Sequence, residues 1–401
     1  MYFIKERNAT MEDFLRLLSG IFIFNTAELI IASILLLIFF FQFYVYIGYY
    51  GKPVRWAKKL NKGTETSSSN SDQPKVSVII EAENEAEYLS ELLPLILSQD
   101  YPNFEVIVVN NGSTDETGIL LERLEQEHKN LYHTFLPHSL DKYGFRKMAL
   151  TLGIKAAKGD VLLFTESYSR PVSDQWIRLM TEKLTDDKDI VLGYSKMSRN
   201  KPFWTRIAAF DNLLFSLQYL STSLKNSPFT GTYRNLAFRR NLFFDNKGFS
   251  QFLYLENSED TFINRVATKT NTAVCLDKES FTETLSDNYS LWRQIKQSYS
   301  AARSCFKGCQ TTLFSTENLS RWIFLIVLLV GISVTIYTQH WGMLGINIFI
   351  LLISLLTREI VINKAARYFD AGKYYFSLSL ISLLQPIYNI RFRHKVKNPV
   401  R

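Results

Sequence analysis

The 401-residue sequence has little of several features that define common classes of protein. It contains three cysteines, Cys275, Cys305 and Cys309, and so sparse and odd a set excludes a secreted scaffold held together by disulfides. Cys305 and Cys309 are four residues apart, but no histidine lies near them, so ordinary buried thiols are a better interpretation than a metal site. No Gly-x-Gly-x-x-Gly follows a predicted strand, which disfavours a fold that cradles a dinucleotide.

Charge is scarce within the long apolar runs of the chain. Three of these runs, at 27–50, 322–341 and 343–362, are long enough to cross a bilayer as helices. Charged residues within these runs are few, which disfavours a transporter, because transport pathways use intramembrane charges. A fourth run, 375–390, is short, contains Pro386 and has basic residues at both ends. It is therefore predicted to be a re-entrant or interfacial segment rather than a crossing helix.

The basic residues are concentrated beside the apolar runs. For this reason the net charge of +8 indicates a membrane surface rather than nucleic acid as the partner. The basic flank and polar linker at 51–75 and the basic tail at 391–401 are expected on the cytoplasmic side by the positive-inside rule. Residues 1–26 form an N-terminal segment with an amphipathic pattern that suits a membrane surface. We expect a multi-pass protein of the cell (inner) membrane that contacts membrane lipids.

Residues 76–312 have the pattern of a soluble domain. Apolar and β-branched runs predict strands at 76–80, 104–109, 131–135, 161–165 and 190–194. Helical patterns lie between and after them, at 86–98, 115–128, 145–157 and 174–185. Less regular amphipathic helices are predicted at 203–224, 259–268 and 288–306. Alternation of strands and helices with short loops predicts an α/β fold with a mostly parallel sheet.

The run 161–165 is predicted to be a strand buried on both faces, in the middle of that parallel sheet. Ligands of open α/β sheets bind beyond the carboxyl ends of the strands. Glu166, Ser167 and Tyr168 follow this strand and are therefore expected at a binding crevice, although a simple turn of the chain would explain them equally well. Ser113-Thr-Asp-Glu116 has the spacing of a capping box and predicts that a helix starts directly after the second strand.

Six stretches of the domain resemble, in order and spacing, the motifs of the family 2 glycosyltransferases. They are Val76-Ser-Val-Ile-Ile-Glu-Ala-Glu-Asn-Glu85, Val108-Val-Asn-Asn-Gly-Ser-Thr-Asp115, Phe164-Thr-Glu-Ser-Tyr-Ser-Arg-Pro171, Gly231-Thr-Tyr-Arg-Asn-Leu-Ala-Phe-Arg-Arg240, Ser258-Glu-Asp260 and Trp292-Arg-Gln-Ile-Lys-Gln297. The resemblance covers about residues 75–310 and implies a GT-A-type nucleotide-sugar domain, which membrane spans on both sides would suit.

The resemblance implies a donor site at the strand ends, where acidic or amide side chains pair with the base and ribose of a nucleotide-sugar. The implied donor-binding residues are Ala82, Glu83, Glu85, Asn110, Asn111, Lys147, Glu166 and Tyr168. Asn110 and Asn111 replace acids of the family and keep their capacity for hydrogen bonding. A simple turn at these two residues is the alternative. For Lys147, which matches a phosphate-contacting lysine, the alternative is a solvated helix lysine.

The resemblance also implies an acceptor side and a catalytic base. The acceptor-side residues implied are Gly231, Arg234, Asn235 and Gln294. Inversion at a sugar carbon needs a base that deprotonates the acceptor hydroxyl. Asp260, preceded by Glu259, matches the family's base. The alternative is that both acids simply favour the dipole at a helix N-terminus.

Two motifs depart from the family pattern. Tyr168 replaces the acid that holds a divalent metal, and a neutral phenol is a poor ligand for a hard cation. The resemblance implies Mg²⁺ or Mn²⁺, whereas the residues present predict no firm cofactor and no metal ligand. Gln297 and Ser298 replace an Arg-Trp pair, which weakens the case for diphosphate clamping and for processive synthesis.

The sequence therefore predicts a membrane-anchored, inverting, hexosyl-type glycosyltransferase. It would move a sugar from a nucleotide-sugar donor to a lipid-linked or glycan acceptor near the membrane, in envelope glycan synthesis. The alternative is a catalytically silent glycosyltransferase-like subunit that acts in binding or assembly. No binding of nucleic acid is expected.

Overall fold

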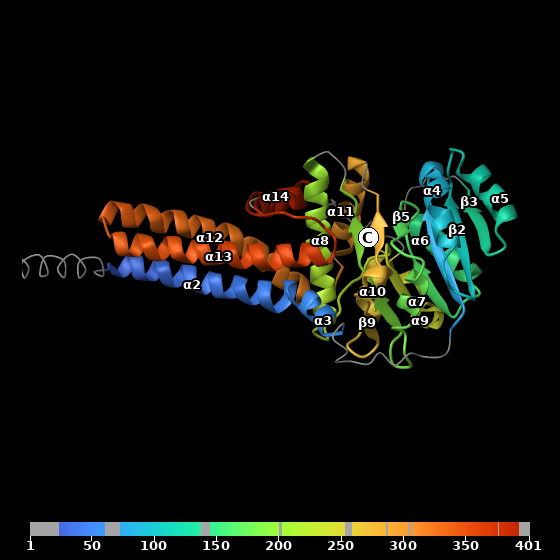
Figure 1. Ribbon diagram of the computed structural model, residues 1–401, viewed down its shortest axis with the longest axis horizontal. Coiled ribbons are helices and arrows are strands. Elements are labelled where there is room, and N and C mark those ends of the chain that lie inside the picture. The colour runs from blue at the N-terminus through green and yellow to red at the C-terminus, as the bar shows by residue number, and fades with distance from the viewer. Residues whose placement is uncertain are drawn as a thin grey trace, which may run out of the picture.

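The computed structural model describes residues 24–60, 73–137, 145–199, 203–252, 259–285, 288–303, 305–306, 308–375 and 377–392. The predicted amphipathic segment up to residue 23, most of the polar linker and the basic tail from residue 393 lie outside these residues. Figure 1 shows a bundle of long helices at one end of the molecule and an α/β domain at the other. Helix α8 (Phe203–Ser223) stands where the two parts meet.

Among the described residues, three helices of the bundle are long and apolar enough to cross a membrane. They are α2 (Thr26–Val45), which continues through the π-helix η1 (Tyr46–Tyr50) into α3 (Lys52–Leu60), then α12 (Gln310–Thr338) and α13 (Trp341–Tyr368). Leu35, Phe324, Leu328 and Ile350 are buried between them. Helix α12 begins at Gln310 instead of the predicted residue 322, because its first turns are amphipathic and pack on the domain rather than forming part of the apolar run.

The domain is built on a seven-stranded sheet in the order β3-β2-β1-β4-β8-β6-β9. The strands are β1 (Val76–Ala82), β2 (Phe104–Asn111), β3 (Leu131–Leu136), β4 (Val161–Phe164), β6 (Ile190–Leu192), β8 (Leu236–Arg239) and β9 (Thr272–Val274). The mostly parallel sheet is confirmed, and β4 lies in its middle. However, β4 pairs in parallel only with β1, since β8 on its other side is antiparallel.

Each face of this sheet has its own buried core. Val78 and Ile80 of β1 point to the face covered by α4 (Ala86–Leu97), α5 (Thr117–Glu127) and α7 (Trp176–Thr181). Ile79, on the opposite face, packs against α6 (Phe145–Ala156), where Gly153 lies so close that a Cβ atom would be 2.9 Å from Ile79. The parallel strands β1, β2 and β4 therefore end at the same edge, between helices on both faces.

The remaining elements are a second, smaller sheet and several helices. A three-stranded sheet has the order β5-β10-β7, with β5 (Ser169–Pro171), β10 (Thr282–Thr284) and β7 (Ser195–Met197). The other helices are α9 (Arg240–Asp245), α10 (Asp260–Val266), α11 (Tyr289–Arg303) and α14 (Ser377–Arg391), with short 3-10 turns at Ser250–Phe252 and Lys278–Ser280. Helix α14 corresponds to the segment 375–390 that was predicted to be re-entrant or interfacial, and it packs against α8 and α12. Its relation to a membrane stays a prediction.

The predicted capping box after β2 is wrong. Helix α5 begins at Thr117, whose backbone N–H donates to Asp115 Oδ1 at 3.0 Å. The hydroxyl of Ser113 accepts instead from the backbone N–H of Asn84, at 2.9 Å. Ser113 thus joins the loop after β2 to the loop after β1, because the two loops lie side by side at the sheet edge.

Candidate active site

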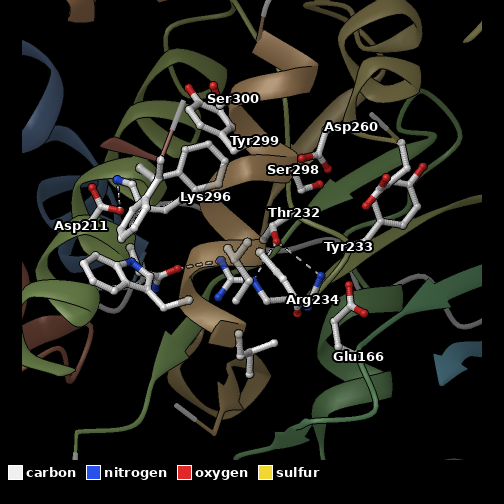
Figure 2. Close-up of a pocket in the computed structure, with 18 of the residues that line it drawn as sticks. Glu166, Asp211, Thr232, Tyr233, Arg234, Asp260, Lys296, Ser298, Tyr299 and Ser300 are labelled. Carbon is white, nitrogen blue, oxygen red and sulfur yellow. Dashed lines mark hydrogen bonds and ion pairs between the residues drawn. The ribbon is translucent and has the colours of Figure 1, made fainter. Parts of the chain in front are cut away.

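A cavity of about 750 Å³ opens at the carboxyl ends of β1 and β4 (Figure 2). Its lining comes from these strand ends, the first turn of α6, the loop before β8, the start of α10, and helices α8, α11, α12 and α14. The cavity therefore extends from the edge of the sheet, where nucleotide ligands bind in folds of this kind, to the helices that join the bundle.

Three acidic side chains at the sheet end of the cavity surround one guanidinium group. Arg146 donates through Nη1 to Glu81 Oε2 at 2.5 Å, through Nε to Glu259 Oε1 at 2.7 Å, and through Nη2 to Glu166. The acids come from the end of β1, the segment after β4 and the residue before α10. Burial raises the pKa of Glu166 even though Arg146 opposes the shift. Such a buried cluster is stable only because opposite charges are paired within it.

Glu85 and Tyr168 lie next to this cluster in the cavity wall. The hydroxyl of Ser167 donates to Glu85, and burial nevertheless raises the pKa of Glu85 to about 8. Burial and the charge of Glu166 raise the pKa of Tyr168 well above its ordinary value. At neutral pH, Glu85 is therefore largely a protonated carboxyl that can donate a hydrogen bond, and Tyr168 is a neutral phenol.

Asp260, the first residue of α10, is the candidate base. Burial, with the charge of Glu259 beside it, raises its pKa well above the ordinary aspartate value, although Arg146 and Arg234 oppose the shift. A carboxylate with a raised pKa is a stronger base at neutral pH, as proton abstraction requires. The Oε2 atom of Glu259 and the hydroxyl of Tyr233 are buried without a hydrogen-bond partner in the part of the chain that the structure describes. Both residues line the cavity, so both atoms are available to a ligand.

Arg234 enters the cavity from the loop before β8 (Figure 2). The side chain is buried and donates to the neutral side chains of Asn212 at 2.6 Å, Thr232 at 3.2 Å and Thr284 at 3.5 Å. Among the described residues, no carboxylate lies within ion-pair distance of Arg234. A buried guanidinium held by neutral groups keeps its full charge for an anionic ligand.

The other end of the cavity is formed by α8, α11 and α14. Lys296 donates to Asp211 at 2.7 Å and to Asn389 at 2.6 Å, and Gln385 donates to Asp211 at 3.1 Å. Trp292 packs among Trp204, Tyr289, Tyr388 and Phe392 with ring-centroid distances of 5.3–6.2 Å. Phe314 and Arg321 of α12 complete this end, which is therefore both aromatic and basic.

The cavity brings together most of the residues that the sequence implied. Glu83, Glu85, Asn111, Lys147, Glu166, Tyr168, Arg234, Glu259, Asp260 and Gln294 all line it. Lys147 is buried, so the alternative of a solvated helix lysine is wrong. The Nδ2 atom of Asn111 donates to Glu81 at 2.8 Å, so this amide is anchored in the acidic cluster.

Four of the implied residues are absent from the lining, namely Ala82, Asn110, Gly231 and Asn235. Asn110 accepts from the backbone N–H of Ser113 at 3.0 Å, as in the turn that was the alternative interpretation. Asn235 is buried and bonds to Trp176, Tyr194 and Ser280, so the structure corrects its acceptor-side role to a structural one. A Cβ atom on Gly231 would lie 2.8 Å from Leu192, so this glycine is needed for packing.

The residues present do not fit a divalent metal ion. No group of three or more His, Cys, Asp or Glu side chains among the described residues is arranged to hold one. Glu166, the acid that remains in the motif at 164–171, is engaged by Arg146, and Tyr168 of the same motif offers only a neutral phenol. Hard cations require several charged oxygen ligands with free lone pairs, and the site does not provide them.

Comparison with known proteins shows which class of protein has this fold. A mannosyltransferase of Pyrobaculum calidifontis, solved in complex with GDP-Man and Mn²⁺, superposes with a TM-score of 0.55 and 16% identity, covering 82% of this chain and 98% of that one. The α/β domain therefore has a GT-A-like fold. Residues 77–245 match the model described as glycosyl transferase family 2, and this part of the chain is a family 2 glycosyltransferase domain.

Two curated relatives match part of the chain. Glycosyltransferase GlyG of Streptococcus pneumoniae is 29% identical over 119 residues, which are 29% of this chain and 38% of that protein. A Methanococcus voltae protein is 30% identical over 103 residues, which are 25% of this chain and 30% of that protein. Its name is dolichyl N-acetyl-alpha-D-glucosaminyl phosphate 3-beta-D-2,3-diacetamido-2,3-dideoxy-beta-D-glucuronosyltransferase. The chain thus spans roughly a third of the length of each of these relatives.

Proposed function

We propose that the protein is a membrane-anchored, inverting glycosyltransferase that moves one sugar from a nucleotide-sugar to a lipid-linked or membrane-near acceptor. The observation that carries this proposal is the shape of the cavity. It joins the acidic and basic groups at the strand ends to an aromatic and basic end formed by α11, α12 and α14. One reaction chamber would then receive the donor from the solvent side and the acceptor from the side of the bundle.

The donor end has groups that suit a nucleoside diphosphate sugar. Lys147 and Arg234 supply positive charge for the diphosphate, which leaves as the nucleoside diphosphate. The protonated carboxyl of Glu85 and the amide of Asn111 can hydrogen bond to the base or the ribose. The unpaired Oε2 of Glu259 can accept from a sugar hydroxyl, which would hold the transferred ring beside Asp260.

Asp260 would act as the base. In an inverting transfer, a hydroxyl oxygen of the acceptor forms a bond to the anomeric carbon while the bond to the diphosphate oxygen breaks on the opposite face. Asp260 takes the hydroxyl proton as the new bond forms. Its raised pKa makes the carboxylate more basic, at the cost of a smaller ionised fraction at neutral pH.

The nature of the acceptor is inferred from the other end of the cavity. Phe314 and Arg321 belong to α12, a helix apolar enough to cross a membrane, so an acceptor carried by a lipid would have a short path to Asp260. The Methanococcus voltae relative is named for a dolichyl-linked sugar phosphate, which supports an acceptor of this class. The basic helix α3, with Lys52, Lys58 and Lys59, supports a cytoplasmic position of the domain.

Transfer should be tested with the full-length protein in nanodiscs. A panel of radiolabelled nucleoside diphosphate sugars would be supplied together with lipid extract, and labelled lipid products would be separated by chromatography. We expect one donor to label one lipid product, and Asp260→Asn to abolish it. Absence of product with every donor, in an assay that a known glycosyltransferase passes, would reject the proposal.

A second candidate function is a catalytically silent subunit that acts in binding or assembly. The engagement of Glu166 by Arg146 favours it, because the acid that would approach the donor is already paired. A silent subunit should retain affinity for a partner protein or a glycan while releasing no nucleoside diphosphate. Labelled product from the nanodisc assay would exclude this alternative.

The orientation needs a separate test. A single cysteine would be placed at Ser67 in the linker or at Trp341, the first residue of α13, in a protein whose Cys275, Cys305 and Cys309 are serine. A membrane-impermeant thiol reagent added to intact cells should label the cysteine at Trp341 and miss the one at Ser67. The reverse pattern would show that the domain lies outside.

A further inference from the structure

We propose that the guanidinium of Arg146 is the resident cation of this site and occupies the place in which Glu81, Glu166 and Glu259 would otherwise hold a divalent metal ion. The inference rests on the proposed function, because it assigns Arg146 to the diphosphate of a nucleotide-sugar. It goes further by specifying that the site works without a metal.

The three acids are brought together only by the fold. They lie 65, 20 and 113 residues from Arg146 in the sequence, yet all three contact its guanidinium. Three carboxylates that converge in this way repel one another unless a cation lies between them. In this protein the cation is a side chain from the first turn of α6.

Arg146 and the three acids all line the cavity, and Arg146 is the most exposed of the four. The side chain of Arg146 is 21% exposed, compared with 10%, 5% and 6% for Glu81, Glu166 and Glu259. A guanidinium has five N–H donors, and the three acids take one each from Nη1, Nη2 and Nε. One further N–H on each terminal nitrogen can therefore turn to the oxygen atoms of a ligand in the cavity.

At this end of the cavity, Arg146 is the cation that contacts Glu81, Glu166 and Glu259. A divalent ion beside Arg146 would place two cations on the same three carboxylates, and their mutual repulsion would be strong in a buried site. Arg146 and a metal ion therefore exclude each other.

Binding of Mn²⁺ alone tests this exclusion without any reliance on catalysis. Free Mn²⁺ would be measured by electron paramagnetic resonance during titration of the detergent-purified full-length protein. The unmodified protein should show no specific site, whereas Arg146→Met should bind one Mn²⁺ at least about tenfold more tightly. In the double variant Arg146→Met/Glu259→Gln, most of that gain should be lost.

Arg170→Met is the matched control, because Arg170 forms an ion pair with a single acid, Glu283, outside the cavity. It should behave like the unmodified protein. If the unmodified protein binds Mn²⁺ as tightly as Arg146→Met does, or if neither binds it, the proposed exchange of cations is wrong. If Arg146→Met fails to fold, Arg146→Lys replaces it. This variant keeps one charge but cannot hold three carboxylates, and it should show a smaller gain in Mn²⁺ affinity.

Calorimetry with UDP and GDP tests the role of Arg146 toward the diphosphate. The affinity of the unmodified protein for the preferred nucleotide should be the same with and without EDTA. Arg146→Met should bind at least about tenfold more weakly in EDTA and regain affinity when Mn²⁺ is added. Binding by the unmodified protein that EDTA abolishes, or equal binding by both proteins in EDTA, would overturn the inference. If neither nucleotide binds to the unmodified protein, the proposed function fails, but the Mn²⁺ titration still decides which cation occupies the site.

Discussion

Lys296 of α11 and Asp211 of α8 form an ion pair of 2.7 Å at the end of the cavity nearest α14. Their side chains are only 11% and 14% exposed. Because Asn389 and Gln385 of α14 bond to the same two groups, the pair joins three helices around the proposed entry of the acceptor. The geometry of this entry therefore depends on a buried pair of charges.

Removal of one member of this pair should destabilise the protein. Lys296→Met leaves Asp211 buried without its cation, which costs about 3 kcal/mol and should lower the thermal unfolding midpoint by about 5–10 °C. Scanning fluorimetry in detergent would measure the shift. The double variant Lys296→Met/Asp211→Asn should recover much of the loss, because it leaves no unpaired charge. A double variant as unstable as the single one would show that the ion pair is not the cause.

Asp260→Asn should separate chemistry from donor binding. The amide keeps the shape of the carboxylate but cannot accept a proton, so turnover should fall by at least about a hundredfold. Donor affinity measured by calorimetry should stay within about twofold. Glu259→Gln is the comparison, since this residue contacts Arg146 and should affect donor binding more than Asp260→Asn does. If the Asp260→Asn protein is active, another residue must be the base.

The pH dependence of transfer should reflect the raised pKa of Asp260. A general base acts in its deprotonated form, so kcat/KM should rise with pH until Asp260 is ionised and then level off. Because the pKa of Asp260 is raised well above 3.8, the increase in kcat/KM should occur at a much higher pH than for an ordinary aspartate. A pH series from about 5 to 9 with the best donor would measure it. A profile that is flat over this range would argue against Asp260 as the base.

Glu85 should make the stability of the fold depend on pH. Its pKa in the folded protein is about 8, against an ordinary value of 4.5, so the folded state favours the protonated carboxyl. The contribution of Glu85 to the stability of the fold is complete below about pH 4.5 and is lost as the pH rises through about 8. Between pH 6 and pH 9 the unmodified protein should lose about 2 kcal/mol that Glu85→Gln does not lose. Unfolding midpoints at both pH values test this, and parallel shifts in the two proteins would contradict it.

The framework of the domain was predictable from the sequence because its strands are short, buried runs of apolar residues. The run Val76–Ala82 is buried at every position. A largely apolar run of this kind predicts a strand from the local sequence alone, without knowledge of the strands that pair with it. The antiparallel strand Leu236–Arg239 was missed because its four residues lie inside a motif that is typical of a binding loop. Its pairing with β4 depends on contacts between residues that are far apart in the sequence.

Site residues that directly follow a strand were predictable from the sequence. Site residues whose role depends on contacts between distant segments of the chain were not. Glu85 and Glu166 were identified because they follow strands, and Asp260 because it begins a helix. Arg146 was missed, since the motif assigns the phosphate-contacting role to the adjacent Lys147. Only the fold shows that Arg146 contacts acids from three separate segments. Asn235 looked like an acceptor contact because a polar residue in a motif has the same appearance whether it binds a ligand or the backbone.

If α12 crosses a membrane as proposed, its length would determine how far from the bilayer the reaction occurs. Its 29 residues span about 44 Å, whereas the hydrocarbon core of a bilayer is about 30 Å thick. About 14 Å of the helix would therefore extend beyond the hydrocarbon core toward the domain. Phe314, near the start of α12, borders the cavity. The distance of Asp260 from the bilayer would therefore depend on the length of this helix. We expect the protein to select acceptors by the distance of the reactive hydroxyl from the membrane. Each added sugar would carry the next hydroxyl beyond the base and end the reaction after one transfer, and product lengths from acceptors of one, two and three sugars would measure this limit.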